Sequence, residues 1–323
     1  MELPMELKQA IENIATNYKN SELKKAVQQL IDKYHTKSGQ GKSLLSKDVE
    51  AIAYALVRLP ATYGAVGDAL KYALEYFDED MTTVLDVGAG SGAAAWATVS
   101  LLDVKQMVCI EREIVMRKLG QRLMKEGNQV LANSQWLDMD LTKDSLLITA
   151  DLVVASYVIN EMNIKDRKNV IDKLWNSSNK MLLIVEPGTP AGYAVLKEAR
   201  EYLLSKGAHI IAPCVHENEC QLDKTDWCHF SCRIQRSKIH KLLKDAEVSY
   251  EDEKYSYMAF VKKKCPCASA RILRHPYITK GQVLLEVCSK VENKSVVINK
   301  KSRDLFKVAR KAKQGDSIDI DLK

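Results

Sequence analysis

The chain has 323 residues, and its formal net charge of +6 is spread unevenly along it. Residues 261–323 contain 16 Lys and Arg against 6 Asp and Glu, which leaves residues 1–260 with a net charge of −4. The length predicts a large core and two domains rather than one, and the basic end predicts a polyanionic partner.

The sequence has no feature of an exported or membrane-spanning protein. Residues 1–6 are acidic, and the longest apolar run, residues 146–159, is interrupted by Asp151. Eight cysteines without a secretion signal predict thiols or metal ligands rather than disulfides. We therefore expect a globular cytoplasmic protein with no membrane contact, and no oligomer is indicated.

The first part of the chain is predicted to be helical. Residues 5–35 show apolar side chains at helical spacing and predict two amphipathic helices. Ser46 is expected to cap a third helix that Pro60 stops, and a fourth is expected over residues 65–77. Residues 38–43 resemble a phosphate loop, but they lack its first glycine and a preceding strand, so we expect a basic connection there. The helices either cover the substrate side of the next domain or only pack against it.

A strand, a glycine-rich turn and a helix follow at residues 83–99. Gly88, Gly90 and Gly92 alternate after the apolar strand, which is typical of a loop that binds a nucleotide cofactor. The same pattern fits a dinucleotide or S-adenosylmethionine. Asp86 favours S-adenosylmethionine, because a carboxylate attracts its ammonium and sulfonium groups and repels a pyrophosphate.

Strands are also predicted at residues 107–111, 151–156 and 181–185, with helices between them. This alternation predicts a parallel sheet, in which ligands bind beyond the carboxyl ends of the strands. Glu111 is expected to accept hydrogen bonds from the ribose hydroxyls of the cofactor. The other candidates at this edge are Asp138 or Asp140, Ser156 to Glu161, and Glu186 in the turn Glu186–Pro190.

Cysteines cluster after a helix predicted at residues 191–206. Cys214, Cys220 and Cys228 lie within fifteen residues of a polar segment, which favours a metal site over scattered core thiols. Their spacing matches neither the paired zinc knuckles nor the ferredoxin runs, and it does not separate zinc from an iron–sulfur centre. His216 and His229 are nearby candidate ligands for zinc. The further thiols are Cys232, Cys265, Cys267 and Cys288.

The last part of the chain is predicted to form a small basic unit rich in strands. Residues 254–264 are predicted as an edge strand of the main sheet, and residues 281–288 and 295–299 as strands of the appended unit. A final helix is predicted over residues 304–313, and its Lys and Arg side chains are expected to contact phosphate groups.

Several separate segments resemble the Rsm-type family of methyltransferase-like proteins, which associate with the small ribosomal subunit in bacteria and mitochondria. The resemblance runs from about residue 45 to the end of the chain. It rests on these segments: Arg58–Tyr63, Leu85–Trp96, Ser156–Glu161, Glu186–Pro190, Ala212–Cys214, Asp226–Phe230 and Tyr250–Lys254.

The resemblance implies a class I methyltransferase fold of the α/β type, a Rossmann-like doubly wound sheet. The domains expected are an N-terminal helical region at 1–78, a methyltransferase-like domain at 79–264 with a metal-binding insertion at 207–232, and a basic β-rich appendix at 265–323. The resemblance also implies a [4Fe–4S] cluster, with zinc as the alternative. Its implied ligands are Cys214, Cys220, Cys228 and Cys288, although Val215 and Gln221 depart from the family's usual segments.

The function implied is methylation of small-subunit rRNA with S-adenosylmethionine, or assembly of the small ribosomal subunit. Asn160 and Glu161 follow the fourth predicted strand, where they could orient or deprotonate an RNA base. Few catalytic groups are needed, because the sulfonium supplies the reactive methyl group. The competing hypothesis is a non-catalytic rRNA-binding assembly factor that keeps the fold.

Overall fold

The computed structural model describes residues 2–37, 45–223 and 225–320. Its central element is an α/β sheet with the strand order β3-β2-β1-β4-β5-β8-β6, in which β7 also pairs with β8. The first five strands in this order run parallel, whereas β8 is antiparallel to β5, β6 and β7. The strands are β1 Thr83–Val87, β2 Gln106–Ile110, β3 Gln135–Leu137, β4 Ala150–Ser156, β5 Ser178–Pro187, β6 His209–Ala212, β7 Phe230–Gln235 and β8 Tyr250–Val261.

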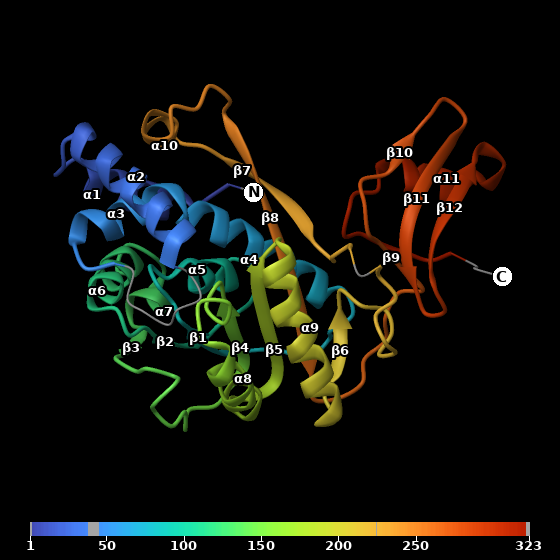
Figure 1. Cartoon of the computed structure of the whole chain (residues 1–323), viewed down its shortest axis with the longest axis horizontal. Coiled ribbons are helices and arrows are strands. Elements are labelled where there is room, and N and C mark those ends of the chain that lie inside the picture. The colour runs from blue at the N-terminus through green and yellow to red at the C-terminus, as the bar shows by residue number, and fades with distance from the viewer. Residues whose placement is uncertain (1, 38–44, 224, 321–323) are drawn as a thin grey trace.

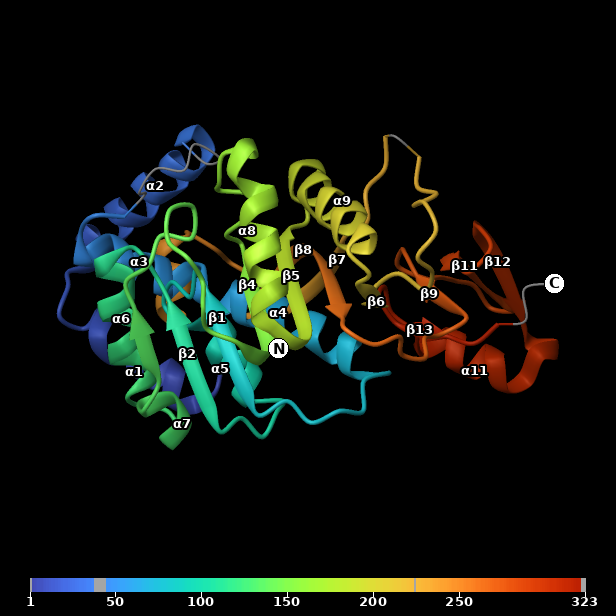
Figure 2. The same cartoon turned by 90° about the horizontal axis from the view of Figure 1, so that it is seen from below.

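Helices cover both faces of this sheet, as Figures 1 and 2 show. Alternate strand residues face opposite sides, so that Val84 packs with the helices on one face and Leu85 with α8 and α9 on the other. The parallel sheet and its two helical layers confirm the predicted doubly wound fold. The helices of this body are α1 Met5–Ala15, α2 Asn20–Lys37, α3 Asp48–Val57, α4 Leu59–Leu74, α5 Ala93–Val99, α6 Ile114–Met124, α7 Gln129–Ala132, α8 Ile164–Ser177, α9 Pro190–Ser205 and α10 Lys238–Leu243.

A second, antiparallel sheet lies at one end of the molecule, beyond β6 and β7 (Figure 1). We call this part, β9 to β13 with α11, the C-terminal lobe. Its own core forms between one face of the sheet and α11. Its elements are β9 Ala270–Ile272, β10 Tyr277–Ile278, β11 Gln282–Ser289, β12 Asn293–Asn299, a short 3-10 turn Lys300–Ser302, α11 Arg303–Lys311 and β13 Ser317–Ile318.

Two predictions about the ends of the third helix were wrong: that Ser46 caps it and that Pro60 stops it. Lys47, not Ser46, precedes the first turn of α3, and the Glu50 carboxylate accepts hydrogen bonds from the backbone N–H groups of both residues. Pro60 lies in the first turn of α4 and does not stop a helix. A proline is tolerated there because the first N–H groups of a helix have no intrahelical acceptor.

The prediction of an edge strand at residues 254–264 was also wrong. β8 lies inside the sheet, with β5 along one side and with β6 and β7 along the other. Its residues from Tyr255 to Val261 are all buried. A strand with both faces and both edges covered has a continuous apolar sequence, and such a run is typical of an interior position.

The basic connection predicted at residues 38–43 lies outside the described residues. Within the part of the chain that the structure describes, no helix is both long enough and apolar enough to cross a membrane.

Candidate functional site

The glycine-rich turn after β1 brings the backbone against a neighbouring loop. Gly88 has φ +66°, and a Cβ placed on it would lie 2.5 Å from Cγ2 of Val158, in the loop that follows β4. A side chain at this position would therefore be strained twice, by its backbone angle and by the contact. Glycine is required here because the two loops touch.

Glu111 connects this turn to the end of β2. One of its carboxylate oxygens accepts a hydrogen bond from Gly90 N at 2.8 Å, and the other accepts one from Glu113 N at 2.7 Å. The side chain is buried, and its two bonds hold the ends of β1 and β2 in a fixed relation. Each carboxylate oxygen keeps a second lone pair that a ligand hydroxyl can use.

The loop after β4 is fixed by a carboxylate from β5. Glu186 is fully buried, and one of its oxygens accepts hydrogen bonds from Ile159 N at 2.9 Å and Asn160 N at 3.3 Å. Tyr157, at the start of the loop, has φ +58°, a strained angle for a residue with a side chain. Its N–H donates to Val185 O at 2.7 Å.

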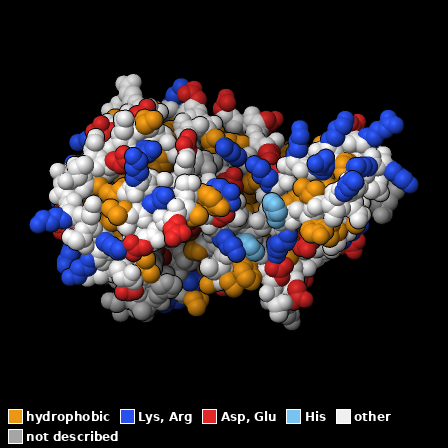
Figure 3. Space-filling view, turned by 90° about the horizontal axis from the view of Figure 1, so that it is seen from above, with side chains coloured by type: hydrophobic (Ala, Val, Ile, Leu, Met, Phe, Trp, Pro, Cys, Tyr) orange, Lys and Arg blue, Asp and Glu red, His pale blue; other side chains and the backbone are white. Residues whose placement is uncertain are grey.

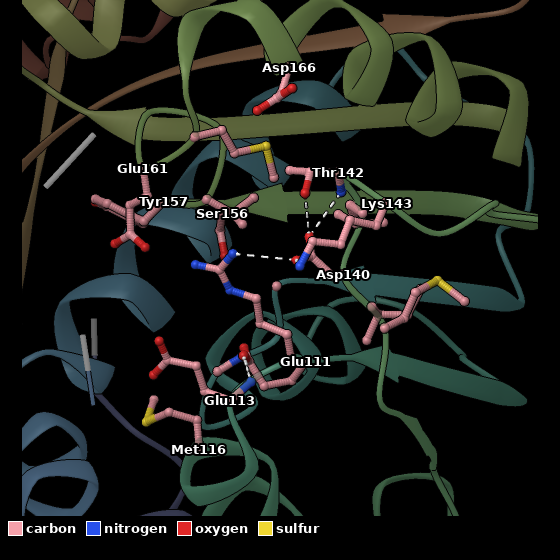
Figure 4. A pocket seen from close by; sticks show the side chains of 18 of the residues that line it. Glu111, Glu113, Met116, Asp140, Thr142, Lys143, Ser156, Tyr157, Glu161 and Asp166 are labelled. Atoms are coloured by element: carbon pink, nitrogen blue, oxygen red, sulfur yellow. Dashed lines mark hydrogen bonds and ion pairs between the residues drawn. The ribbon is translucent and has the colours of Figure 1, made fainter. Parts of the chain in front are cut away.

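These loops surround a cavity of about 340 Å³ at the carboxyl ends of the strands, which we call the edge cavity. Its volume lies in the range of about 300 to 1,000 Å³ that is usual for small-molecule sites. Figure 4 shows acidic side chains from different elements around one open space. Of the predicted site residues, those that line the edge cavity are Gly88, Gly90, Glu111, Ser156 and Glu161.

Several other predicted residues do not line the edge cavity. Asp86 is fully buried on the α5 side of the sheet and accepts a hydrogen bond from Ala95 N at 3.1 Å. Asp138 forms an ion pair with Arg117 at 2.9 Å, and Asp140, the alternative to it, lines the cavity instead. Also absent from the wall are Gly92, Asn160 and Glu186.

Burial shifts several carboxyl groups near the cavity toward their protonated forms. It raises the pKa of Asp86 to about 7, and the nearby Glu111 adds to this shift. Burial, followed by the charges of Glu113 and Glu111, raises the pKa of Glu161 to about 8. Burial likewise raises the pKa of Glu186 to about 8, despite the two backbone N–H groups that it accepts. A cationic ligand would stabilise the charged form of the one that lines the cavity, Glu161.

The sequence left open whether the N-terminal helices cover the substrate side, and neither Tyr54 nor any residue of the long strand β8 was predicted as part of the site. Tyr54 of α3 lines the edge cavity. The Tyr157 hydroxyl donates to Glu253 of β8 at 2.9 Å, and Arg58 donates two hydrogen bonds to the same carboxylate, at 3.1 and 3.2 Å. One signal for this network was available, because Arg58, Tyr157 and Glu253 all lie in segments that carry the family resemblance.

A second, smaller cavity of about 30 Å³ lies between the body and the C-terminal lobe, and we call it the cysteine cavity. Arg200 and Arg271 line it together with apolar side chains, and the Tyr193 hydroxyl lies 3.2 Å from Sγ of Cys220. All four predicted metal ligands face it, although they come from distant parts of the chain: Cys214, Cys220, Cys228 and Cys288.

The remaining thiols near this region lie elsewhere. Cys232 is buried in β7 beside Gly64, and the Cys267 thiol donates to Val215 O at 3.4 Å.

Two of the thiols that line the cysteine cavity have raised pKa values. Burial raises the pKa of Cys214, and it raises that of Cys288 to about 12. Within the described ranges, no group of three or more His, Cys, Asp or Glu side chains is arranged so that it could hold a metal ion. His216 and His229 do not line the cysteine cavity.

The basic side chains of the C-terminal lobe gather around α11. A shallow hollow of about 600 Å³ lies over this helix and the turn before it. Phe306 forms part of its floor, and the other lining residues are Lys300, Arg303, Lys307, Arg310 and Lys311.

The strand order, the glycine turn and the cavity beyond the strand ends define a class I methyltransferase-like α/β protein. A family model described as "Mitochondrial small ribosomal subunit Rsm22" matches residues 48–319. The chain therefore belongs to the Rsm22 family, and the family predicted from its motifs is confirmed.

Two relatives show how far the similarity extends. The human "Ribosome assembly protein METTL17, mitochondrial" is 24% identical over 263 residues, which cover 74% of this chain and 55% of that protein. The Schizosaccharomyces pombe "Rsm22-cox11 tandem protein 2, mitochondrial" is 24% identical over 339 residues, which cover 85% of this chain and 44% of that protein. The chain thus spans about half the length of these relatives.

Solved structures with a related fold include two methyltransferases. A putative RNA methyltransferase from Pyrococcus horikoshii has a TM-score of 0.40 at 16% identity and covers 61% of this chain and 79% of its own. Magnesium protoporphyrin IX methyltransferase from Synechocystis, with bound S-adenosylmethionine, has a TM-score of 0.41 at 13% identity and covers 72% and 91%. The fold assignment rests on the strand order and not on these scores.

The contact between the two loops can be tested at Gly88. Gly88→Ala should lower the free energy of unfolding in two ways. The backbone angle is strained for alanine, and the new methyl group overpacks Val158, which adds about 1 to 3 kcal/mol to the loss. Gly207→Ala is the matched control, since Gly207 has φ +82° and no atom within 4 Å of the added carbon. Urea unfolding of both variants measures the difference. Equal destabilisation of the two would show that the loops yield easily and do not require glycine.

Proposed function

We propose that this protein binds S-adenosylmethionine in the edge cavity and acts on the rRNA of the small ribosomal subunit, or in the assembly of that subunit. The observation that supports this most directly is the cavity itself, which Gly88, Gly90 and Glu111 line at the ends of β1 and β2. Membership of the Rsm22 family and the similarity to a human ribosome assembly protein support the ribosomal part of the proposal.

The residues of the edge cavity suit the chemical groups of this cofactor. Gly90 has φ +55°, which favours glycine, and a Cβ placed there would make an ordinary contact with Met116 at 3.4 Å. Glu111 offers carboxylate lone pairs to ribose hydroxyls. Glu113 and Glu161 place two more carboxyl groups in the wall, and in their ionised forms these attract a sulfonium and an ammonium group. When bound, S-adenosylmethionine would supply an activated methyl group.

Whether a methyl group is transferred depends on what accepts a proton from the RNA base. Glu161 lines the cavity, but Asn160 does not, so only one of the two predicted catalytic residues faces a ligand there. With its pKa raised to about 8, Glu161 is largely protonated at neutral pH in the free protein, and a bound cationic cofactor would return it to the ionised form that accepts a proton. The non-catalytic alternative, a cofactor-binding assembly factor, keeps the same cavity and the same cofactor. Incubation with labelled S-adenosylmethionine and small-subunit RNA, in wild type and Glu161→Gln, separates the two hypotheses.

The raised pKa of Glu161 predicts a pH-dependent affinity for S-adenosylmethionine. The cationic cofactor stabilises the ionised carboxylate, so its binding should strengthen as the pH rises from 6 toward 8, by up to about tenfold per pH unit if one proton is released. Isothermal titration calorimetry in buffers of different ionisation enthalpy measures both the affinity and the proton release. Glu161→Gln should flatten the pH profile.

Two variants make this measurement decisive. Gly90→Arg should abolish binding, because its side chain fills the cavity, whereas Glu126→Gln removes an exposed carboxylate elsewhere and should change nothing. An affinity that is independent of pH in wild type would show that Glu161 does not face the positive charge of the cofactor. Equal binding of NAD would contradict the choice of cofactor.

We further propose that Cys214, Cys220, Cys228 and Cys288 hold an iron–sulfur cluster between the body and the C-terminal lobe. The support is that all four thiols line one small cavity, next to the cations Arg200 and Arg271. Those cations would offset the negative charge of a centre with four thiolate ligands. Such a centre would be structural, since it would close the long loop between Cys228 and Cys288.

Cys228→Ser should remove the metal and loosen the joint between the two parts of the molecule. Anaerobically purified wild type should be brown and contain iron and sulfide, while the variant should be colourless and be cleaved faster by protease between residues 207 and 232. Cys232→Ser is the matched control, because Cys232 is a buried thiol that does not line the cysteine cavity. If the wild type contains one zinc per chain and no iron, the site is a zinc site and not an iron–sulfur centre. If it contains no metal, the proposal is wrong.

The basic surface around α11 is proposed to contact rRNA phosphates. Its hollow is lined by Lys and Arg side chains and is open to solvent. Replacing Arg310, Lys311 and Lys313 together by Gln should weaken RNA binding irrespective of sequence. The slope of log affinity against log salt should fall by about 0.7 to 0.9 for each phosphate group that the variant no longer binds.

The matched control removes three exposed charges from α6 and the residue that follows it. Lys118 and Arg122 are exposed on α6, and Lys125 directly follows the helix, so their replacement by Gln changes the net charge of the protein equally. Filter binding to small-subunit RNA at several salt concentrations measures both triple variants. An equal effect of the two would mean that net charge, and not the α11 surface, determines the affinity.

A further inference from the structure

One end of one face of the C-terminal sheet is left uncovered by the described part of the molecule. Val283, Leu285 and Ile298 pack against Phe306 and Ala309 of α11 and form the core of the lobe. Alternate residues of β11 and β12 therefore point away from α11. This side of the sheet continues through Glu286 and Ser295 to Cys288 and Asn293, which face the cysteine cavity. We call its other end the outer face, and it consists of Tyr277, Gln282, Leu284, Val297 and Asn299.

An aromatic and aliphatic row crosses the outer face. Tyr277 lies directly opposite Leu284 in the strand register, and Leu284 lies opposite Val297. Tyr277 is 68% exposed and Val297 is 56% exposed, so the described part of the molecule leaves the row open. A tyrosine ring beside aliphatic side chains provides a flat apolar surface, on which the face of a nucleic-acid base can stack.

Hydrogen-bonding groups and cations lie next to this row. Gln282 is opposite Asn299, and both side chains are exposed. Lys280 is in the turn before β11, and Lys300 directly follows β12, where its N–H donates to Gly281 O at 3.2 Å. Neither lysine forms an ion pair within the described ranges of the chain. The amides can contact base edges, and the lysines can contact phosphates.

We propose that the outer face binds a single-stranded segment of RNA, with a base stacked on Tyr277 and phosphates at Lys280 and Lys300. This deepens the proposed rRNA contact and rests on it. The net charge of residues 261–323, with 16 basic and 6 acidic residues, favours RNA over a protein partner. Figure 3 shows Lys and Arg side chains around the C-terminal lobe with hydrophobic side chains between them. A duplex hides its bases in the stack, so only unpaired nucleotides can use the tyrosine.

Fluorescence anisotropy of the full chain with a labelled, unstructured oligoribonucleotide of about 12 nucleotides tests the proposal. Tyr277→Ala should weaken binding of the single strand by about 5- to 150-fold, the effect expected when one base–aromatic stack is removed. The salt dependence should not change, because every phosphate partner remains in place. Tyr277→Phe keeps the ring and should bind like wild type. A duplex of the same length should bind both variants like wild type.

The outcomes separate this proposal from the function on which it rests. If wild type binds the single strand and Tyr277→Ala binds it equally well, the outer face is not an RNA site, while the α11 contact still stands. If wild type binds neither RNA form, the rRNA contact itself fails. If Tyr277→Ala leaves RNA binding intact but abolishes binding to RNA-free small-subunit proteins, the outer face is a protein-docking surface and the proposal is wrong.

Discussion

The contact between the glycine turn after β1 and the loop after β4 determines the shape of the candidate site. A carbon atom added at Gly88 would lie 2.5 Å from Val158, so the two loops meet at backbone distance. Glu186 accepts a hydrogen bond from Ile159 N in the loop after β4, and Glu111 accepts one from Gly90 N in the glycine turn. Asp86 likewise accepts a hydrogen bond from Ala95 N of α5. Three buried carboxyl groups thus hold backbone N–H groups in place around the cavity. Their raised pKa values are the electrostatic cost of this arrangement.

A partly buried ion pair connects this loop to the rest of the body. Arg58 and Tyr157 both donate to Glu253, so that α4, the loop after β4 and strand β8 meet at one carboxylate. Buried ion pairs contribute little net stability, and removal of one partner of a fully buried pair costs about 3 to 5 kcal/mol. The Arg58 side chain is 31% exposed, so water reduces this cost here. The network therefore fixes position more than it adds stability. It also helps to hold Tyr157 at its strained backbone angle, because the hydroxyl is anchored on Glu253.

Much of the main sheet, and of the edge that borders the edge cavity, could be predicted from the sequence. The apolar runs and the glycine turn are local signals, and the rule for parallel sheets places Glu111, Ser156 and Glu161 at one edge of the sheet, where all three line one cavity. The same alternation that predicts the strands also explains the position of Asp86, because it shares a sheet face with Val84 and not with Leu85. Tyr54 could not be found this way. Only tertiary packing brings its helix to the cavity, and no local pattern records that.

The cysteines show the same limit in a different form. Spacing groups Cys214, Cys220 and Cys228, but Cys288 joins them only through strand pairing, since it lies opposite Arg271 of β9. Arg271 is buried, and its guanidinium donates to Pro213 O at 3.2 Å, to Gly315 O at 2.9 Å and to Glu75 at 3.2 Å. One arginine thus fastens the C-terminal lobe to the body beside the four thiols. Because the lobe has its own core, this joint sets the direction in which α11 and the outer face point relative to the edge cavity.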